Sequence, residues 1–113
     1  MDFGDLLTID GIVPVLRAKD KSEVLQQLSL RAAETTGLLQ RDVFDALLQR
    51  ERLGSTGFGR GIAIPHVKFR TLDLIVCIFA RLAAPIPFDS PDAEPVDLVF
   101  RILGPEHASG DHL

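Results

Sequence analysis

Two long apolar stretches in the second half of the chain limit the folds that it can adopt. Residues 74–82 read Leu-Ile-Val-Cys-Ile-Phe-Ala-Arg-Leu, and residues 96–103 form a second, largely apolar run. Nearly continuous apolar runs of this length are typical of strands inside a sheet. We therefore expect residues 74–82 to form a central strand that is covered on both faces. Neither run approaches the ~20 apolar residues of a membrane-spanning helix.

The first half of the chain predicts one strand and two helices. Residues 12–16 are short and β-branched, and Pro14 places this strand at a sheet edge or at a bulge. Asp20 has the form of an N-cap, with apolar residues at helical spacing after it and Gly37 in position to end the helix. A second helix is expected over residues 41–52.

Helices followed by strands predict a layered α/β domain, and a length of 113 residues corresponds to one domain over residues 1–113. Two short helices are too few to cover both faces of such an apolar sheet. We therefore expect that C-terminal helices are missing from this chain, or that a partner subunit supplies the cover. Residues 84–94 contain three prolines, which predicts a loop with one short strand over residues 86–88.

Composition excludes several classes of function. The net charge is −4, from 12 Lys and Arg against 16 Asp and Glu, whereas nucleic-acid surfaces usually carry a basic excess. The single cysteine, Cys77, cannot form an internal disulfide and is expected to be a small buried hydrophobic residue. The N-terminus shows no basic stretch before an apolar core, so no signal peptide is visible. These features favour a cytoplasmic domain without membrane insertion.

A glycine-rich stretch, residues 54–61, separates the expected helices from the strands and holds four glycines in eight residues. A P-loop would need Lys followed by Ser or Thr, but Arg60 and Gly61 stand there. The dinucleotide-binding fingerprint also fails, because both loops run from a strand into a helix and this one runs from a helix into a strand. Two interpretations remain open: a structural loop without chemistry, or the setting for His66.

His66 follows an expected short strand over residues 62–64 and is preceded by Pro65. An imidazole has an ordinary pKa of about 6.5, so its neutral form can act as a nucleophile at cellular pH. A histidine that attacks phosphorus needs one ring nitrogen free and the other held by a hydrogen bond, with donors nearby for the phosphoryl oxygens. A histidine after a strand is, by itself, more often structural than catalytic.

Groups near His66 in the sequence supply the donors that such chemistry needs. The hydroxyls of Ser55 and Thr56 and the backbone N–H groups of the glycines are neutral donors. Arg50 or Arg60 can supply positive charge. Phe58 lies between two glycines; we weigh an exposed contact for an incoming protein equally against simple packing over the loop.

The sequence from residue 53 to His66 resembles the active-site signature of the fructose/mannitol-type (type-2) enzyme IIA domains of the bacterial phosphoenolpyruvate-dependent phosphotransferase system. The strongest part is Gly-Ile-Ala-Ile-Pro-His at residues 61–66, with Arg50 and Glu51 upstream. The match is best with the nitrogen-regulatory branch, called PtsN or enzyme IIA-Ntr. Similarity also covers residues 6–8, 42–44 and 95–100.

The resemblance implies a three-layer α/β sandwich, with a mixed β-sheet flanked by helices. It implies that His66 accepts the phosphoryl group, that Arg50 neutralises its charge, and that His112 lies beside His66. Ser55 and Thr56 fall where the family places small polar residues around the phosphate. No cofactor is implied. His107 and His112 lack metal-ligand spacing, so no metal site is expected.

The implied function is that of a phosphohistidine phosphocarrier. Its donor would be a small HPr-type phosphocarrier protein, and its phosphorylation state would regulate target proteins of nitrogen or potassium control. Two alternatives stay open: a sugar-uptake enzyme IIA that passes phosphate to a separate IIB domain, and a binding module without turnover. Two departures from the family pattern are the residue after the active histidine, which is Val67, and the end of the chain after Asp111-His112-Leu113. Members continue through helices that pack on the sheet, so we expect that the chain is C-terminally truncated.

Overall fold

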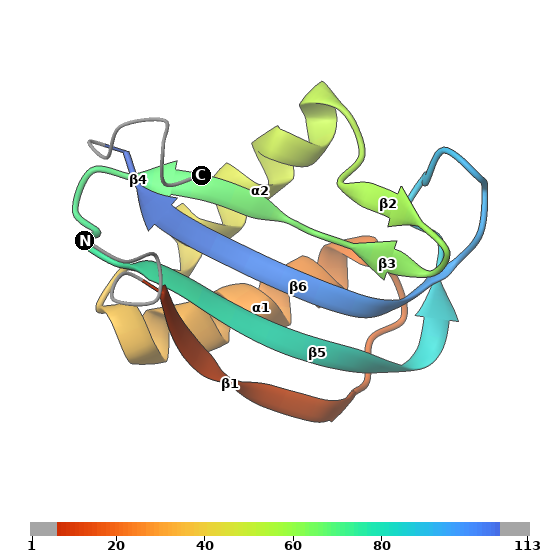
Figure 1. Ribbon diagram of the computed structural model, residues 1–113, viewed down its shortest axis with the longest axis horizontal. Helices are drawn as coiled ribbons and strands as arrows, with labels where there is room; N and C mark the ends of the chain where they lie inside the picture. Colours follow the sequence, from red (N-terminus) through yellow and green to blue (C-terminus); the bar gives the residue numbers. More distant parts are fainter. Residues whose placement is uncertain (1–6, 107–113) are drawn as a thin grey trace.

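Two helices and six strands make up the part of the chain that the computed structural model describes, residues 7–106 (Figure 1). In chain order they are β1 (Leu7–Leu16), α1 (Lys21–Thr36), α2 (Gln40–Leu53), β2 (Gly57–Gly59), β3 (Ile62–Ala63), β4 (His66–Phe69), β5 (Ile75–Ile86) and β6 (Val96–Pro105). Both expected helices are confirmed, as is the edge position of β1. Its register is irregular between Val13 and Leu16, around Pro14.

The strands form one mixed sheet in the order β1-β5-β6-β3-β2, and β4 also pairs with β6. Strand β5 is parallel to β1 and antiparallel to β6. The short strands β3 and β4 follow one another along the other side of β6, both parallel to it. The expectation of an α/β fold with a mixed sheet is therefore confirmed.

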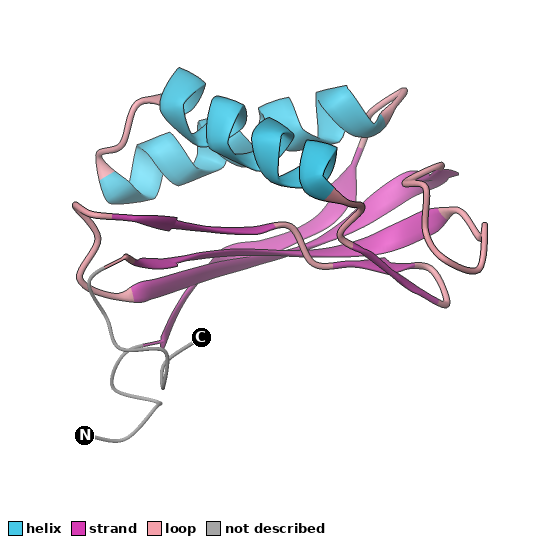
Figure 2. Ribbon diagram, turned by 90° about the horizontal axis from the view of Figure 1, so that it is seen from above, coloured by secondary structure: helices cyan, strands magenta, loops and turns pink. Residues whose placement is uncertain are grey.

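Both helices lie on the same face of the sheet (Figure 2). Within residues 7–106 the fold thus has two layers, and the further helical layer of the expected sandwich is not among these residues. Alternate residues of β5 show the asymmetry: Ile78, Ala80 and Leu82 are buried, whereas Phe79 is half-buried and Arg81 is exposed. The expectation that this strand is covered on both faces is wrong for the described part of the chain, because the helices cover one face only.

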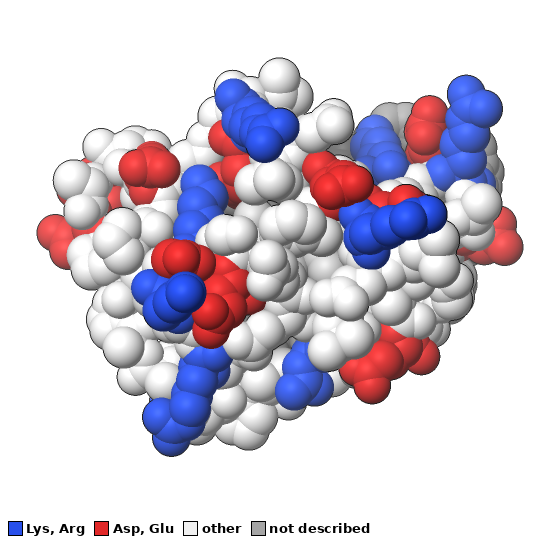
Figure 3. Space-filling model, turned by 180° about the vertical axis from the view of Figure 1, so that it is seen from behind, with Lys and Arg blue, Asp and Glu red and all other residues white. Residues whose placement is uncertain are grey.

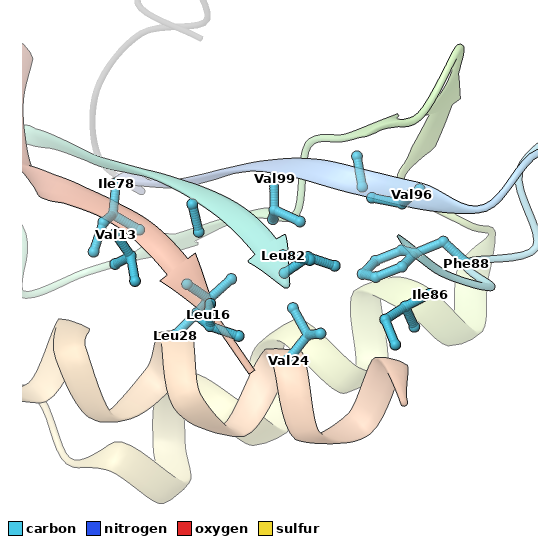
Figure 4. Packing of buried hydrophobic residues seen from close by; sticks show 12 residues of the cluster. Val13, Leu16, Val24, Leu28, Ile78, Leu82, Ile86, Phe88, Val96 and Val99 are labelled. Atoms are coloured by element: carbon cyan, nitrogen blue, oxygen red, sulfur yellow. The ribbon is translucent and has the colours of Figure 1, made fainter. Parts of the chain in front are cut away.

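The core lies between α1 and the covered face of the sheet (Figure 4). Val24 and Leu28 of α1 are fully buried against Val13, Ile78 and the other members of this cluster. Full burial of one such side chain contributes roughly 1.5–3 kcal/mol, so the cluster is the main source of stability. A second cluster joins both helices to β4 and β6 through Leu25, Ala32, Val43, Leu47, Leu72 and Leu103.

The side of the sheet without helices, which Figure 1 faces, is called the open face below. Strand register and side-chain alternation assign it Ile12, Ile62, His66, Lys68, Cys77, Phe79, Arg81, Leu98, Phe100 and Ile102. The rings of Phe79 and Phe100 pack on it with their centroids 4.7 Å apart. The opposite, helical side shows basic and acidic groups intermixed (Figure 3). The open face thus combines half-buried apolar side chains with the exposed residues His66, Lys68 and Arg81.

Two local expectations need correction. Cys77 is half-buried rather than buried, because it points to the open face. The short strand expected over residues 86–88 is instead the end of β5, which runs through Pro85 to Ile86. An irregularity between Arg81 and Ile86 in the pairing with β6 accommodates that proline. No helix within residues 7–106 is long and apolar enough to cross a membrane.

The ends of α1 follow the sequence signals. The Asp20 side chain accepts a hydrogen bond from the backbone N–H of Glu23 at 2.9 Å, and Gly37 ends the helix with φ of 79°.

Replacing Asp20 with Ala removes this acceptor, so we expect the free energy of unfolding to fall by about 1 kcal/mol. Urea denaturation measures the change. Asp20→Asn keeps an acceptor oxygen and serves as the control; equal losses in the two variants would contradict the capping role.

Candidate functional site

His66 begins β4 and is exposed on the open face. Strand β6 fixes its backbone: the N–H of Ile102 donates to the carbonyl of Pro65 at 2.8 Å, and His66 is in register with Ile102. The pairing of β3 with β6 stops at Ala63 and that of β4 with β6 begins at His66, so residues 64 and 65 form an interruption in the pairing along β6. This interruption leaves the carbonyl of Ile64 available to the histidine ring.

The Nδ1 atom of His66 lies 2.7 Å from the carbonyl oxygen of Ile64. A carbonyl oxygen only accepts hydrogen bonds, so Nδ1 carries the proton in this contact. The other ring nitrogen, Nε2, then keeps its lone pair. The contact therefore selects the tautomer that a nucleophilic histidine needs and orients the ring at the same time.

Glycines in the preceding loop allow β2 and β3 to lie close to residues 88–97. A Cβ atom at Gly57 would stand 2.2 Å from Oγ of Ser90, and one at Gly61 would stand 2.9 Å from Oδ1 of Asp97. Gly61 also has φ of 82°, a conformation that other residues rarely adopt. Close packing and one tight turn thus account for Gly57 and Gly61 without a phosphate-binding role.

Asp92 fastens the turn between β2 and β3 to the loop after β5. Its carboxylate accepts hydrogen bonds from the backbone N–H of Arg60 at 2.8 Å and of Glu94 at 3.1 Å. These bonds, that of Arg60 foremost, hold the pKa of Asp92 below its ordinary value. The resulting stabilisation is present above the ordinary carboxyl pKa and is lost as the pH falls through the lowered one.

The hydroxyls of Ser55 and Thr56 have partners inside the protein. Ser55 Oγ donates to the carbonyl of Phe88 and accepts from the N–H of Gly57, while Thr56 Oγ1 donates to Glu51. Thr56 is buried. Each hydroxyl proton is therefore already used, and both side chains hold the loop in place. Their contact with a phosphoryl group stays a prediction.

The other predicted site residues lie in three different settings. The Arg50 guanidinium donates to the carbonyl of Gly54 at 2.9 Å, at the start of the loop, rather than to His66. Phe58 is 71% exposed on β2, so it is not packed over the loop. His112 and His107 lie outside the described residues. Within residues 7–106, no group of three His, Cys, Asp or Glu residues could hold a metal ion.

Sequence reasoning gave no role to Glu51 and Lys21. Glu51, in the last turn of α2, has a side chain only 4% exposed, and its Oε2 lies 2.6 Å from Nζ of Lys21. Helical spacing was the available signal, because Glu51 follows Val43 and Leu47 at four-residue intervals and so lies on the same buried face of α2.

The packing of Gly57 gives a direct test of the loop. Gly57 has no positive φ, so Gly57→Ala adds crowding rather than backbone strain. Its Cβ would stand 2.2 Å from Oγ of Ser90 and 3.0 Å from Oγ of Ser55, and we expect a loss of roughly 1–3 kcal/mol in the free energy of unfolding. Ser90 Oγ has no hydrogen-bond partner in the described residues. In a Ser90→Ala background the Gly57→Ala loss should therefore shrink. Chemical denaturation of all four proteins measures the coupling, and equal losses in both backgrounds would refute it.

Known proteins match this chain over most of its length. The family model described as phosphoenolpyruvate-dependent sugar phosphotransferase system, EIIA 2, matches residues 5–113. The nitrogen regulatory protein of Bradyrhizobium diazoefficiens is 50% identical over 113 residues, which are 100% of this chain and 74% of that protein. The nitrogen regulatory protein of Klebsiella oxytoca is 43% identical over 99 residues, 87% of this chain and 61% of that protein.

A solved structure shows the same fold. The crystal structure of the nitrogen regulatory protein IIA-Ntr from Neisseria meningitidis matches with a TM-score of 0.87 and 38% identity, over 96% of this chain and 75% of that one. The chain therefore spans 61% to 75% of the length of these three relatives. It belongs to the EIIA 2 family of the phosphoenolpyruvate-dependent sugar phosphotransferase system.

Proposed function

We propose that this chain is a phosphohistidine phosphocarrier of the phosphotransferase system, with His66 as the phosphoryl acceptor. The observation that carries the proposal is the hydrogen bond from Nδ1 of His66 to the Ile64 carbonyl, at 2.7 Å. It leaves Nε2 as the nucleophilic atom on an exposed side chain. The donor is a phosphohistidine on an HPr-type protein of the cytoplasm.

Phosphoryl transfer to His66 needs no cofactor, because the bonds that form and break join phosphorus to the two histidine rings. The Nε2 lone pair forms a bond to phosphorus, the bond between phosphorus and the donor's ring nitrogen breaks, and its electron pair returns to the donor ring. The His66 ring gains positive charge while Nδ1 keeps its proton. The Ile64 carbonyl, already placed at that proton, stabilises the charge without rearrangement. Catalysis of this kind needs positioning and charge neutralisation rather than further covalent chemistry.

The surroundings of His66 suit a protein as the phosphoryl donor. The ring stands on the open face beside half-buried apolar residues such as Ile102 and Phe100, so a partner can approach across a broad surface. Exposed Phe58 on β2 is proposed as a further contact with that partner. Arg50 and His112 are proposed to bind the phosphoryl group, together with Ser55 after a change of partner.

We propose regulation as the main role, with the phosphorylation state deciding the binding of target proteins. The nitrogen regulatory proteins of Bradyrhizobium diazoefficiens and Klebsiella oxytoca support this choice. The fructose-specific EIIA component of Haloferax volcanii, 46% identical over 100% of this chain, keeps the sugar-uptake alternative open. Transfer from phosphorylated His66 to an isolated IIB domain would support the sugar-uptake alternative. Target binding that is insensitive to phosphorylation would support the binding-only alternative.

Intact-protein mass spectrometry at mildly alkaline pH tests the phosphocarrier role. After incubation with phosphoenolpyruvate, enzyme I and an HPr-type carrier, we expect one phosphoryl addition to the chain. His66→Ala should abolish it, because the acceptor atom is gone. Lys68→Ala, on the same exposed strand face, should leave it intact. Labelling that survives in His66→Ala, or an unlabelled wild-type chain, would overturn the proposal.

A further inference from the structure

We propose that Glu51 is a positioning residue for His66: its buried carboxylate holds Thr56, and Thr56 holds the backbone of Ile64 that selects the histidine tautomer. The inference rests on the proposed function, since it adds a residue to the machinery of that same site. It concerns a side chain that does not touch the reacting atoms.

The Glu51 carboxylate holds Thr56 at three points. Both carboxylate oxygens accept from the backbone N–H of Thr56, at 3.2 and 3.1 Å, and Oε1 also accepts from its hydroxyl. The Glu51 side chain is only 4% exposed. A charge at such a depth is retained only when it is paired and fully hydrogen-bonded, so this arrangement is costly to disturb.

Lys21 supplies the balancing charge and extends the network to the loop after β5. It is the first residue of α1, and its Nζ atom lies 2.6 Å from Glu51 Oε2. The same ammonium group donates to the carbonyl of Phe88 at 3.4 Å and lies 5.0 Å from the centre of the Phe88 ring. The start of α1 and the end of α2 are thereby tied to one point of the loop.

Two consecutive backbone contacts connect Thr56 to His66. The carbonyl of Thr56 accepts from the N–H of Ile64 at 2.9 Å, and the carbonyl of Ile64 accepts from Nδ1 of His66 at 2.7 Å. Pro65 follows Ile64 and restricts its backbone, so a displacement of its N–H is passed on to its carbonyl. On the other side of Ile64, pairing with β6 keeps His66 in place. The position of Thr56 therefore sets the distance between the Ile64 carbonyl and the ring.

Two measurements on folded protein separate this role from a purely structural one. Nitrogen-15 NMR of the His66 ring reports which nitrogen carries the proton, and single-turnover phosphorylation by the HPr-type carrier reports the rate of transfer.

Glu51→Ala removes every side-chain acceptor for the Thr56 N–H and hydroxyl. Glu51→Gln keeps one acceptor oxygen and the shape of the side chain, but loses the charge that pairs with Lys21. Val13→Ala, in edge strand β1 on the far side of the sheet, is the matched control for lost stability.

We expect Glu51→Ala to raise the fraction of His66 with the proton on Nε2 and to slow phosphorylation roughly tenfold to a hundredfold. The tautomer fraction and the phosphorylation rate of Glu51→Gln should lie between those of Glu51→Ala and the wild type. This variant keeps the test valid if the alanine variant does not fold. Val13→Ala should lower the melting temperature and leave the tautomer and the phosphorylation rate unchanged. Wild-type tautomer and rate in folded Glu51 variants would overturn the inference. If the wild-type chain accepts no phosphate, the proposed function fails, while the tautomer measurement still decides the role of Glu51.

Discussion

The parallel pairing of β3 and β4 with β6 is the constraint on which the site depends. Strand β6 is held from its other side by β5, which is antiparallel to it. Residues 64 and 65 interrupt the pairing along β6 at the point where β3 ends and β4 begins. The fold thus provides a strand that carries His66 and, two residues before it, the carbonyl of Ile64 that binds its ring.

A loop held from two directions completes this arrangement. Asp92 binds the turn between β2 and β3, and Glu51 binds the beginning of the loop at Thr56. Both anchors are carboxylates that accept hydrogen bonds from backbone N–H groups. Such hydrogen bonds are strong because the acceptor is charged. His66, the proposed acceptor, therefore stands on a preorganised scaffold, and little reorganisation would be required if charge develops on its ring.

Local signals in the sequence predicted both helices and made His66 the proposed acceptor, whereas features that depend on long-range contacts could not be predicted. Asp20 and Gly37 bound α1 through contacts within a few residues, so both could be identified from the chain alone. The His66 motif was predicted from chemistry and family resemblance. Gly57, by contrast, is required by Ser90, thirty-three residues away, and Glu51 is buried by Lys21 of another helix. The uncovered side of β5 could not be predicted either, because Cys77 and Phe79 are apolar like the residues of the covered side.

The position of phosphorus on the ring of His66 directly tests the proposal that the Ile64 carbonyl leaves Nε2 as the nucleophilic atom. Phosphorylated protein labelled with nitrogen-15 at histidine would show, from ring nitrogen shifts and couplings to phosphorus, which nitrogen carries the phosphoryl group. We predict phosphorus on Nε2 and a proton retained on Nδ1, since the Ile64 carbonyl occupies the Nδ1 side at 2.7 Å. Phosphorus on Nδ1 would contradict it, because the hydrogen bond that orients the ring would then have to break for transfer to occur.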